Sequence, residues 1–212
     1  MGLFGKTTGG GAKGETTRAQ RHSSGWAELS KLITARPSLR VLDIGPTSSA
    51  NINLITSLGH SIYMANLVEE ANRPEWLTQA AENTKDAPSY DVDRFVSMNM
   101  DFAGRRFDVV LLWDTLDYVP DALAQPIVNR LASVLDEDGH LLAMFHGKLG
   151  ADEGTFSRYH LVDAPMLEVQ RAGGFPLLHT YSNRQVETMF KEFASYKFFL
   201  AKDTLREVLL RR

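Results

Sequence analysis

The sequence predicts an α/β fold: a single doubly wound, mostly parallel seven-stranded sheet with helices on both faces and an antiparallel last strand. Short runs rich in Val, Ile and Leu alternate with segments whose apolar residues recur every three or four positions. These are the signals of strands and amphipathic helices. The run over residues 107–113 is almost continuously apolar, as expected for a strand buried on both faces of a parallel sheet. This alternation favours right-handed strand–helix–strand crossovers over an antiparallel meander.

Length and composition limit the chain to one sizeable core. It has 212 residues, 43% of them hydrophobic, which suits one domain better than two. The formal net charge of −3 provides no basic field, which argues against nucleic acid as a partner. The lack of cysteine excludes disulfides, thiolate zinc sites and cysteine nucleophiles. No apolar run reaches membrane-spanning length, so we expect a cytoplasmic protein without a membrane partner.

Residues 1–24 differ in composition from the rest of the chain. Six glycines fall within the first 14 residues, among threonines and serines, and four basic side chains accompany one acidic side chain. Such a segment offers too little apolar surface to offset the conformational entropy lost on folding. We therefore predict a flexible, basic tail over residues 1–24 and an α/β domain over residues 25–212.

The first half of the domain is predicted from its apolar periodicity and its stop signals. Proline lacks an N–H and breaks helices, and a glycine that follows a helix adopts the conformation that ends it. The expected elements are a helix over 26–33 stopped by Pro37, a strand over 40–44, a helix capped by Ser48 or Ser49 and ended by Gly59, a strand over 60–67, a weaker helix over 74–85, and a third strand over 94–98.

The second half continues the alternation. The expected elements are a strand over 107–113, a helix over 122–135 ended by residues 136–139, a strand over 141–145, a helix over 164–172 capped by Asp163, and strands over 175–181 and 194–201. The segment between the last two strands is too polar to assign. Residues 147–160 contain three glycines and form either a mobile lid or a plain surface loop.

Several short motifs follow one another in a characteristic order. A strand over 41–45 ends in Asp-Ile-Gly, Asn66 ends the second strand, and Asp101 follows the third. Residues 107–112 then read Phe-Asp-Val-Val-Leu-Leu, and residues 172–175 read Ala-Gly-Gly-Phe. In order and spacing, the chain resembles the class I (Rossmann-like) S-adenosylmethionine-dependent methyltransferase family over residues 26–203, with an atypical glycine loop.

The resemblance implies a methyltransferase whose cofactor is S-adenosylmethionine and whose acceptor is unidentified, a small molecule being favoured. It leaves the oligomeric state unknown. The cofactor-binding residues that it implies are Asp43, Gly45, Pro46, Thr47, Asn66, Leu67, Asp101, Phe102 and Trp113. We assign no catalytic residue, because methyl transfer from a sulfonium needs little beyond in-line positioning. We assign no metal site, because the histidines lack carboxylates at ligand spacing.

The sequence departs from the family pattern at the cofactor loop. The loop is often Gly-x-Gly-x-Gly, but Thr47 and Ser49 stand at the second and third glycine positions, and Pro46 stiffens the loop. Asn66 replaces an acidic residue, so ribose hydroxyls lose one acceptor, at a cost of about 1–2 kcal/mol. Two hypotheses follow: an active methyltransferase, or a catalytically degenerate methyltransferase-like module that acts by binding a ligand or a protein.

Other residues near the predicted site have two interpretations each. Asp43 either contacts the ligand or holds the loop and the next helix by hydrogen bonds. His146, at the end of the fifth strand, is either a general base or a hydrogen-bonded structural residue. Asp114 and Tyr118 follow the fourth strand, where they either face a substrate or belong to the core.

Overall fold

The computed structural model describes residues 17–78, 89–147, 156–200 and 203–212. It confirms the α/β class and corrects the sheet. Instead of one seven-stranded sheet, the described residues form a six-stranded mixed sheet in the order β3-β2-β4-β5-β9-β8 and a separate three-stranded antiparallel sheet in the order β1-β7-β6. No helix among these residues is long and apolar enough to cross a membrane.

The large sheet has a parallel half and an antiparallel edge. Its strands are β2 (Arg40–Ile44), β3 (Ser61–Ala65), β4 (Phe107–Trp113), β5 (Leu135–His146), β8 (Ser195–Phe199) and β9 (Leu205–Arg211). The first four run parallel, whereas β9 is antiparallel to both β5 and β8. The antiparallel strand is therefore β9, which lies beyond the last strand predicted from the sequence.

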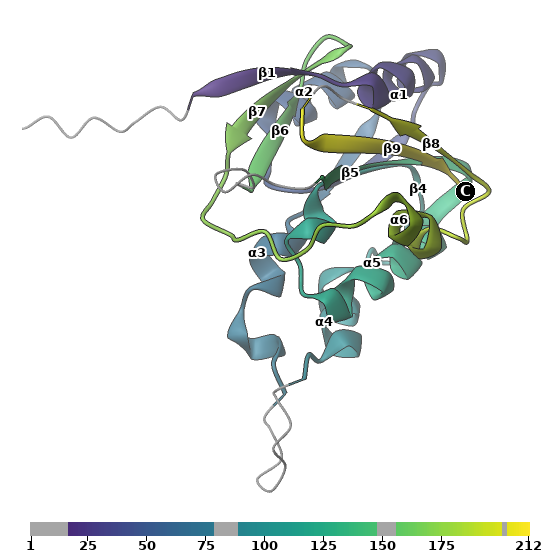
Figure 1. The fold of residues 1–212 in the computed structure, drawn as a ribbon. Helices are drawn as coiled ribbons and strands as arrows, with labels where there is room; N and C mark the ends of the chain where they lie inside the picture. The colour runs from purple at the N-terminus through teal and green to yellow at the C-terminus, as the bar shows by residue number, and fades with distance from the viewer. Residues whose placement is uncertain (1–16, 79–88, 148–155, 201–202) are drawn as a thin grey trace, which may run out of the picture.

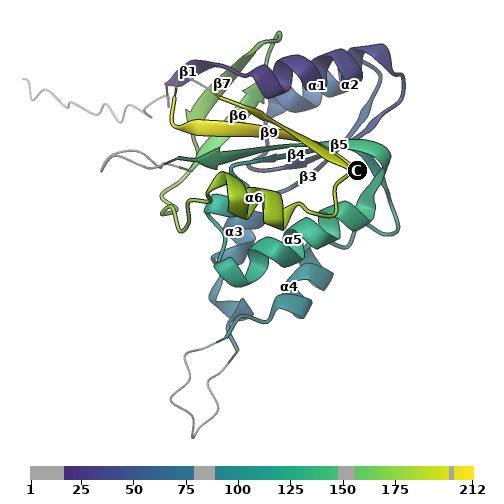
Figure 2. The ribbon, with the colours of Figure 1, turned by 45° about the vertical axis from the view of Figure 1, so that its right-hand side comes forward.

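Helices cover both faces of the large sheet (Figures 1 and 2). They are α1 (Ser24–Ala35), α2 (Ser49–Ser57), α3 (Leu67–Ala71), α4 (Val92–Asn99), α5 (Asp121–Val134) and α6 (Asn183–Met189), with short 3-10 turns η1 (Pro74–Trp76) and η2 (Thr115–Asp117). Successive residues of a strand point to opposite faces. Val41 therefore packs in one apolar cluster with α1 and α2, and Leu42 in the other with α3, α4, α5 and α6.

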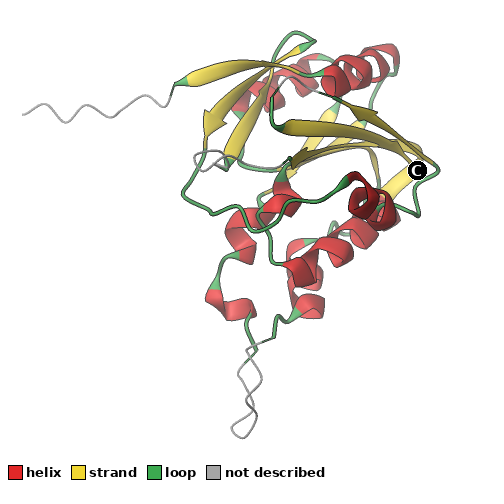
Figure 3. Ribbon diagram, in the orientation of Figure 1, coloured by secondary structure: helices red, strands yellow, loops and turns green. Residues whose placement is uncertain are grey.

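The small sheet packs beside α1 and α2 at one end of the large sheet (Figure 3). Its strands are β1 (Arg18–His22), β6 (Ser157–Leu161) and β7 (Met166–Arg171). Tyr159, Leu161 and Leu167 join the same apolar cluster as Trp26 and Ile55. This packing holds the small sheet over the N-terminus of α2.

The predicted third strand over 94–98 is wrong, because this segment is helix α4. The side chain of Asp91 caps the helix and accepts from the backbone N–H of Arg94. Phe95 is buried edge-on against Trp76, with ring centroids 5.2 Å apart, and Val96 packs on the same cluster. The N-cap and the helical apolar spacing outweigh the apparent strand signal.

Two further predicted elements are wrong. The expected helix over 164–172 is strand β7, because the segment pairs with β1 on one side and β6 on the other. Asp163 lies in the hairpin turn, where its carbonyl accepts from Met166. Residues 175–181 form no strand. The backbone N–H groups of Leu178 and His179 donate to the carbonyl of Asp117 instead of to a neighbouring strand.

The remaining differences concern the ends of predicted segments. Arg18–His22, which the sequence assigned to the tail, form strand β1 and pair with β7. Ser23 caps α1 and Ser24 begins it, so these residues are also not part of a tail. Ser157–His160 belong to β6 rather than to a lid or loop. The start of the predicted weak helix is the 3-10 turn η1 followed by a bridge from Leu77 to Tyr90. Residues 1–16, 79–85 and 148–155 of the predicted tail, weak helix and lid lie outside the described residues.

Candidate functional site

The carboxyl ends of the parallel strands bring several predicted site residues together. Ile44 pairs with Ala65, so Gly45 and Asn66 follow side by side, and the N–H of Gly45 donates to the carbonyl of Ala65 at 2.9 Å. A Cβ on Gly45 would lie 3.0 Å from Cδ1 of Trp113. A side chain at residue 45 would therefore press on the indole ring. This edge is where open α/β sheets bind ligands.

Asp43 is held inside the protein at this edge. Its Oδ1 accepts from Nε1 of Trp113 at 2.6 Å, and its Oδ2 accepts from Nδ2 of Asn51 at 2.8 Å. The side chain is 2% exposed. Burial raises the pKa of Asp43 to about 6, although both hydrogen bonds lower it. Asp43 therefore joins β2 to α2 and to the end of β4, and no bond from its side chain to the loop over 45–48 is found among the described residues.

Trp113 links this edge to the small sheet. Its ring stacks on Tyr159, with centroids 5.0 Å apart and planes inclined by 10°. Its φ of 51° is unusual for a bulky residue. The hydroxyl of Tyr159 donates to Oδ2 of Asp114 at 2.9 Å, and burial raises the pKa of Asp114 to about 7. A buried polar network thus connects β4 with β6.

The N-terminus of α2 is also tied to β6. Ser48 is the N-cap, and its Oγ accepts from the N–H of Asn51. The same Oγ lies 2.7 Å from Nδ1 of His160. Oδ1 of Asn51 accepts from the N–H of Leu161 at 2.7 Å. Ser48 is therefore the cap predicted as one of two alternatives, and its hydroxyl is engaged with protein groups.

Asn66 has one bonded and one unbonded side-chain atom. Its Nδ2 donates to Oε2 of Glu69 at 2.9 Å. Its Oδ1 is buried and has no hydrogen-bond partner among the described residues. Pro46 is half-buried and Thr47 is exposed beside it, whereas Leu67 is buried in the core as the first residue of α3.

Asp101 and Phe102 do not reach this edge. They lie between α4 and the first residue of β4, and the ring of Phe102 packs edge-on against Phe107 with centroids 5.3 Å apart. Oδ1 of Asp101 accepts from the N–H of Ala103 within a turn. Because β4 runs from Phe107 to Trp113, these residues lie at the amino end of the strand, opposite Gly45.

His146, the last residue of β5, is paired with Asp117. Its Nδ1 lies 2.8 Å from Oδ2 of Asp117 and donates to it when that carboxyl group is ionised, because a carboxylate oxygen only accepts. Its backbone N–H donates to the same oxygen at 2.6 Å. Oδ1 of Asp117 is buried without a partner among the described residues. Burial lowers the pKa of His146, but the bond to Asp117 and the charge of Asp114 raise it further, so the net shift is upward.

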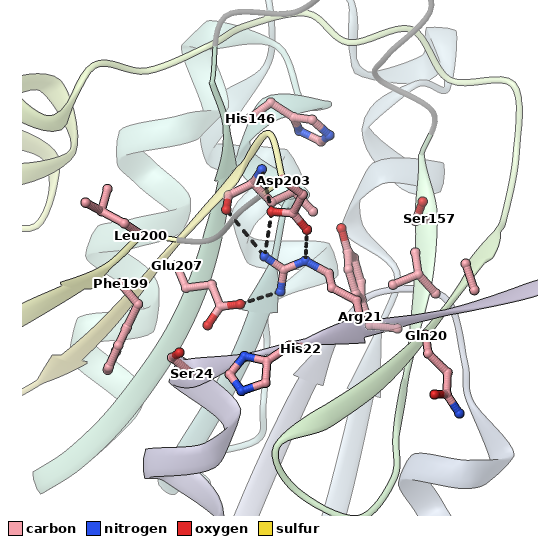
Figure 4. A pocket seen from close by; sticks show the side chains of 14 residues that line it. Gln20, Arg21, His22, Ser24, His146, Ser157, Phe199, Leu200, Asp203 and Glu207 are labelled. Atoms are coloured by element: carbon pink, nitrogen blue, oxygen red, sulfur yellow. Dashed lines mark hydrogen bonds and ion pairs between the residues drawn. The ribbon is translucent and has the colours of Figure 1, made fainter.

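A cavity of about 780 Å³ separates the small sheet from the ends of β5 and β9 (Figure 4). His146, Ser157 and Tyr159 line it, together with apolar side chains of Val169, Phe199, Leu200 and Leu205. The side chain of Arg21, on β1, forms part of the cavity wall. Its guanidinium bonds Oδ2 of Asp203 at 2.6 Å and also bonds Glu207.

Glu207 joins this arginine to the start of α1. The carboxylate is 1% exposed and accepts from Oγ of Ser23 at 3.0 Å and from the N–H of Gly25 at 2.6 Å. An anion at a helix N-terminus is favourable because the free N–H groups and the helix dipole stabilise it. Glu207 thereby connects β9, β1 and α1.

Sequence reasoning missed Arg21 and Glu207. Arg21 was assigned to the tail, and the polar segment around it contains no strand signal. Glu207 lies beyond residue 203, where the resemblance ended, although the Leu- and Val-rich run over 205–211 was a usable strand signal. Asn51 was also missed, because the helix contains several other polar residues and the sequence does not distinguish Asn51 from them.

Solved structures with the same fold are methyltransferases of low sequence identity. A putative type 11 methyltransferase from Sulfolobus solfataricus has a TM-score of 0.51 and 11% identity, covering 91% of this chain and 94% of its own. The CcbJ methyltransferase from Streptomyces caelestis has a TM-score of 0.50 and 14% identity, covering 89% and 95%. These likenesses concern the fold.

A third structure is the 1,6-didemethyltoxoflavin-N1-methyltransferase of Burkholderia thailandensis, with bound 1,6-didemethyltoxoflavin and S-adenosylhomocysteine. It has a TM-score of 0.46 and 14% identity, covering 90% of this chain and 79% of its own. A search of curated protein sequences finds no match. The model of the methyltransferase domain family, however, matches residues 17–193. The chain therefore belongs to the methyltransferase domain family, and the resemblance drawn from the sequence is confirmed.

Proposed function

We propose that the protein transfers a methyl group from S-adenosylmethionine, bound beside Gly45 and Asn66, to a small-molecule acceptor. Membership of the methyltransferase domain family supports the reaction class. The location is supported by the loop that begins at Gly45, at the carboxyl edge of the parallel strands. Small-molecule acceptors are favoured because a cavity of about 780 Å³ lies at the same end of the large sheet, beside the last residue of β5.

One observation carries the placement of the cofactor. Oδ1 of Asn66 is a buried acceptor without a partner among the described residues, and such an atom is costly unless a ligand or water satisfies it. A ribose hydroxyl has the required donor. Glu69, held 2.9 Å from Nδ2 of Asn66, adds a carboxylate next to it. The residues present therefore fit the sugar of the cofactor.

The roles of the implied residues then differ from one another. Asn66 and Glu69 would hold the sugar, and the exposed Thr47 with Pro46 would border the amino-acid part of the cofactor. Asp43 acts indirectly, because both of its oxygens accept hydrogen bonds from protein groups. We leave Asp101 and Phe102 out of the proposed site because they lie at the opposite end of β4. The bound cofactor supplies an electrophilic methyl group on its sulfonium.

Calorimetric titration with S-adenosylmethionine tests this proposal without knowledge of the acceptor. We expect saturable binding and a rise in melting temperature. Compared with Glu69→Gln alone, Asn66→Asp combined with Glu69→Gln should bind about fivefold more tightly, because a two-acceptor anion at residue 66 is worth about 1 kcal/mol. The second change matters because Asn66→Asp alone would place two carboxylates against each other.

Two control variants make the titration specific. Glu69→Gln alone separates the effect of the second change, and Asp101→Ala should leave the affinity unchanged. Absence of heat and of any melting shift at millimolar ligand would overturn the proposal and favour the binding-module hypothesis. A large loss of affinity in Asp101→Ala would overturn the proposed placement.

A further inference from the structure

The charge on the cavity wall restricts what the cavity can bind. Asp203 and Glu207 both bond the guanidinium of Arg21, so two carboxylates accompany one guanidinium among the described lining residues, which also include His22 and His146. Burial lowers the pKa of Arg21, but these carboxylates raise it further and keep it charged. An anionic ligand would bring a third negative group to an arginine that is already paired. The wall therefore disfavours anions and accepts uncharged or cationic molecules.

The hydrogen-bonding state of His146 places an acceptor on the same wall. With Nδ1 as the donor to Asp117, the neutral imidazole carries its proton on Nδ1 and its lone pair on Nε2. His146 lines the cavity, and Figure 4 shows its ring at one end of the cavity. Tyr118 packs edge-on against this ring, with centroids 5.7 Å apart, and limits its rotation.

Building on the proposed function, we propose that the cavity binds the methyl acceptor, an uncharged or cationic molecule with an apolar body and a hydroxyl group, and that Nε2 of His146 takes the hydroxyl proton. The apolar body fits the side chains of Val169, Phe199, Leu200 and Leu205. A hydroxyl fits a base better than an amine does, because a neutral amine attacks with its own lone pair.

The reaction balances with groups already named. The acceptor oxygen forms a bond to the methyl carbon while its proton passes to Nε2 of His146. The carbon–sulfur bond of the sulfonium donor breaks, and its electron pair stays on sulfur. Asp117 stabilises the imidazolium that forms. The proton then leaves His146 for solvent, which restores the neutral base.

Labelling of a single introduced cysteine tests the charge preference. The chain contains no cysteine, so Val169→Cys places one thiol in the cavity wall. Its reaction rates with trimethylammonium-ethyl and sulfonato-ethyl methanethiosulfonate are compared with those at Met98→Cys, a 63% exposed site on α4. One net negative charge about 8 Å from the thiol should make the cationic reagent react about fivefold faster than the anionic reagent, relative to the same ratio at Met98→Cys. Asp203→Asn should reduce the preference.

Protection from labelling tests the acceptor class and the base. At pH 8, 4-propylphenol should slow labelling at the cavity cysteine, whereas 4-propylbenzoate should not. His146→Asn keeps a donor near the Nδ1 position and removes the acceptor at Nε2, so it should weaken protection by the phenol. If this variant does not fold, protonating His146 at lower pH removes the same lone pair. The charged groups that set its titration are Asp114, Asp117 and Asp203.

Several results would overturn the inference. They are a preference for the sulfonate reagent, equal protection by phenol and benzoate, no protection by the phenol, or phenol protection that is insensitive to both His146→Asn and pH. If Val169→Cys does not fold, Leu200→Cys at the 87% exposed cavity rim replaces it. These measurements need no methyl donor, so their failure is distinct from failure of cofactor binding at Gly45.

Discussion

Trp113→Phe should destabilise the protein more at pH 8 than at pH 5. Nε1 of Trp113 donates to Oδ1 of Asp43 at 2.6 Å, and Asp43 is 2% exposed. Burial raises the pKa of Asp43 to about 6, while the bonds from Asn51 and Trp113 oppose that rise. Phenylalanine retains an aromatic ring but lacks the N–H. Asp43 therefore loses one of two donors that stabilise its charged form.

The size of the effect follows from linkage between protonation and folding. A hydrogen bond to a charged group is worth about 1.5–3 kcal/mol, which corresponds to about one to two pKa units. With a folded pKa of about 6 and an ordinary value of 3.8, Asp43 makes the protein about 1.4 kcal/mol more stable at pH 5 than at pH 8. A raised folded pKa gives stability that is present at low pH and lost as the pH rises through it. Trp113→Phe should widen the difference to about 2.5–3.5 kcal/mol.

Urea unfolding at pH 5 and pH 8 measures both quantities. Trp26→Phe is the matched control, because Trp26 is also 2% exposed and its Nε1 donates to the uncharged carbonyl of Val162. It should cost the same at both pH values. In an Asp43→Asn background the pH dependence of Trp113→Phe should disappear. Equal losses at the two pH values in Trp113→Phe would refute the reasoning.

Three further predictions concern stability and the chain terminus. Gly25→Ala should lower the melting temperature strongly, because its Cβ would lie 2.5 Å from Cδ1 of Leu142 and 2.9 Å from Oε2 of Glu207. Gly174→Ala, which meets no atom within 4 Å, should change it little. Glu207→Gln should destabilise by about 1.5–3 kcal/mol in urea unfolding, because it weakens a charge-assisted hydrogen bond to Arg21 while Asp203 still pairs with the guanidinium; a change below about 0.5 kcal/mol would contradict this. Deleting residues 2–16 should leave the melting temperature within about two degrees, because these glycine- and threonine-rich residues offer little apolar surface to bury. Deletion through His22 should lower the melting temperature sharply, because it also removes β1 and Arg21.

Local signals in the sequence determined much of the parallel half of the fold. Residues 107–113 were identified as a strand because a nearly continuous apolar run suits burial on both faces, and residues 40–44 were identified as the strand that leads into the turn at Gly45. Helix α5 followed from its three- and four-residue apolar spacing. Ser48 was one of two predicted caps, because the hydroxyl of a serine before a helix satisfies a free N–H. The same signals placed Gly45, Asn66 and Trp113 at the ends of neighbouring strands, where the structure brings them together.

Tertiary structure alone decided the rest. The segment over 166–171 is a strand because it pairs with β1 on one side and with β6 on the other. The sequence of the segment alone does not indicate this pairing. Arg21 and Glu207 form an ion pair although they are 186 positions apart. Because Asp91 caps a helix rather than leading into a strand, Asp101 lies at the far end of β4 from Gly45. Periodicity and caps act over a few residues, whereas strand pairing and buried ion pairs depend on distant segments. The sequence by itself therefore predicted the loop after β2. The cavity between the small sheet and the ends of β5 and β9 forms only when the chain folds.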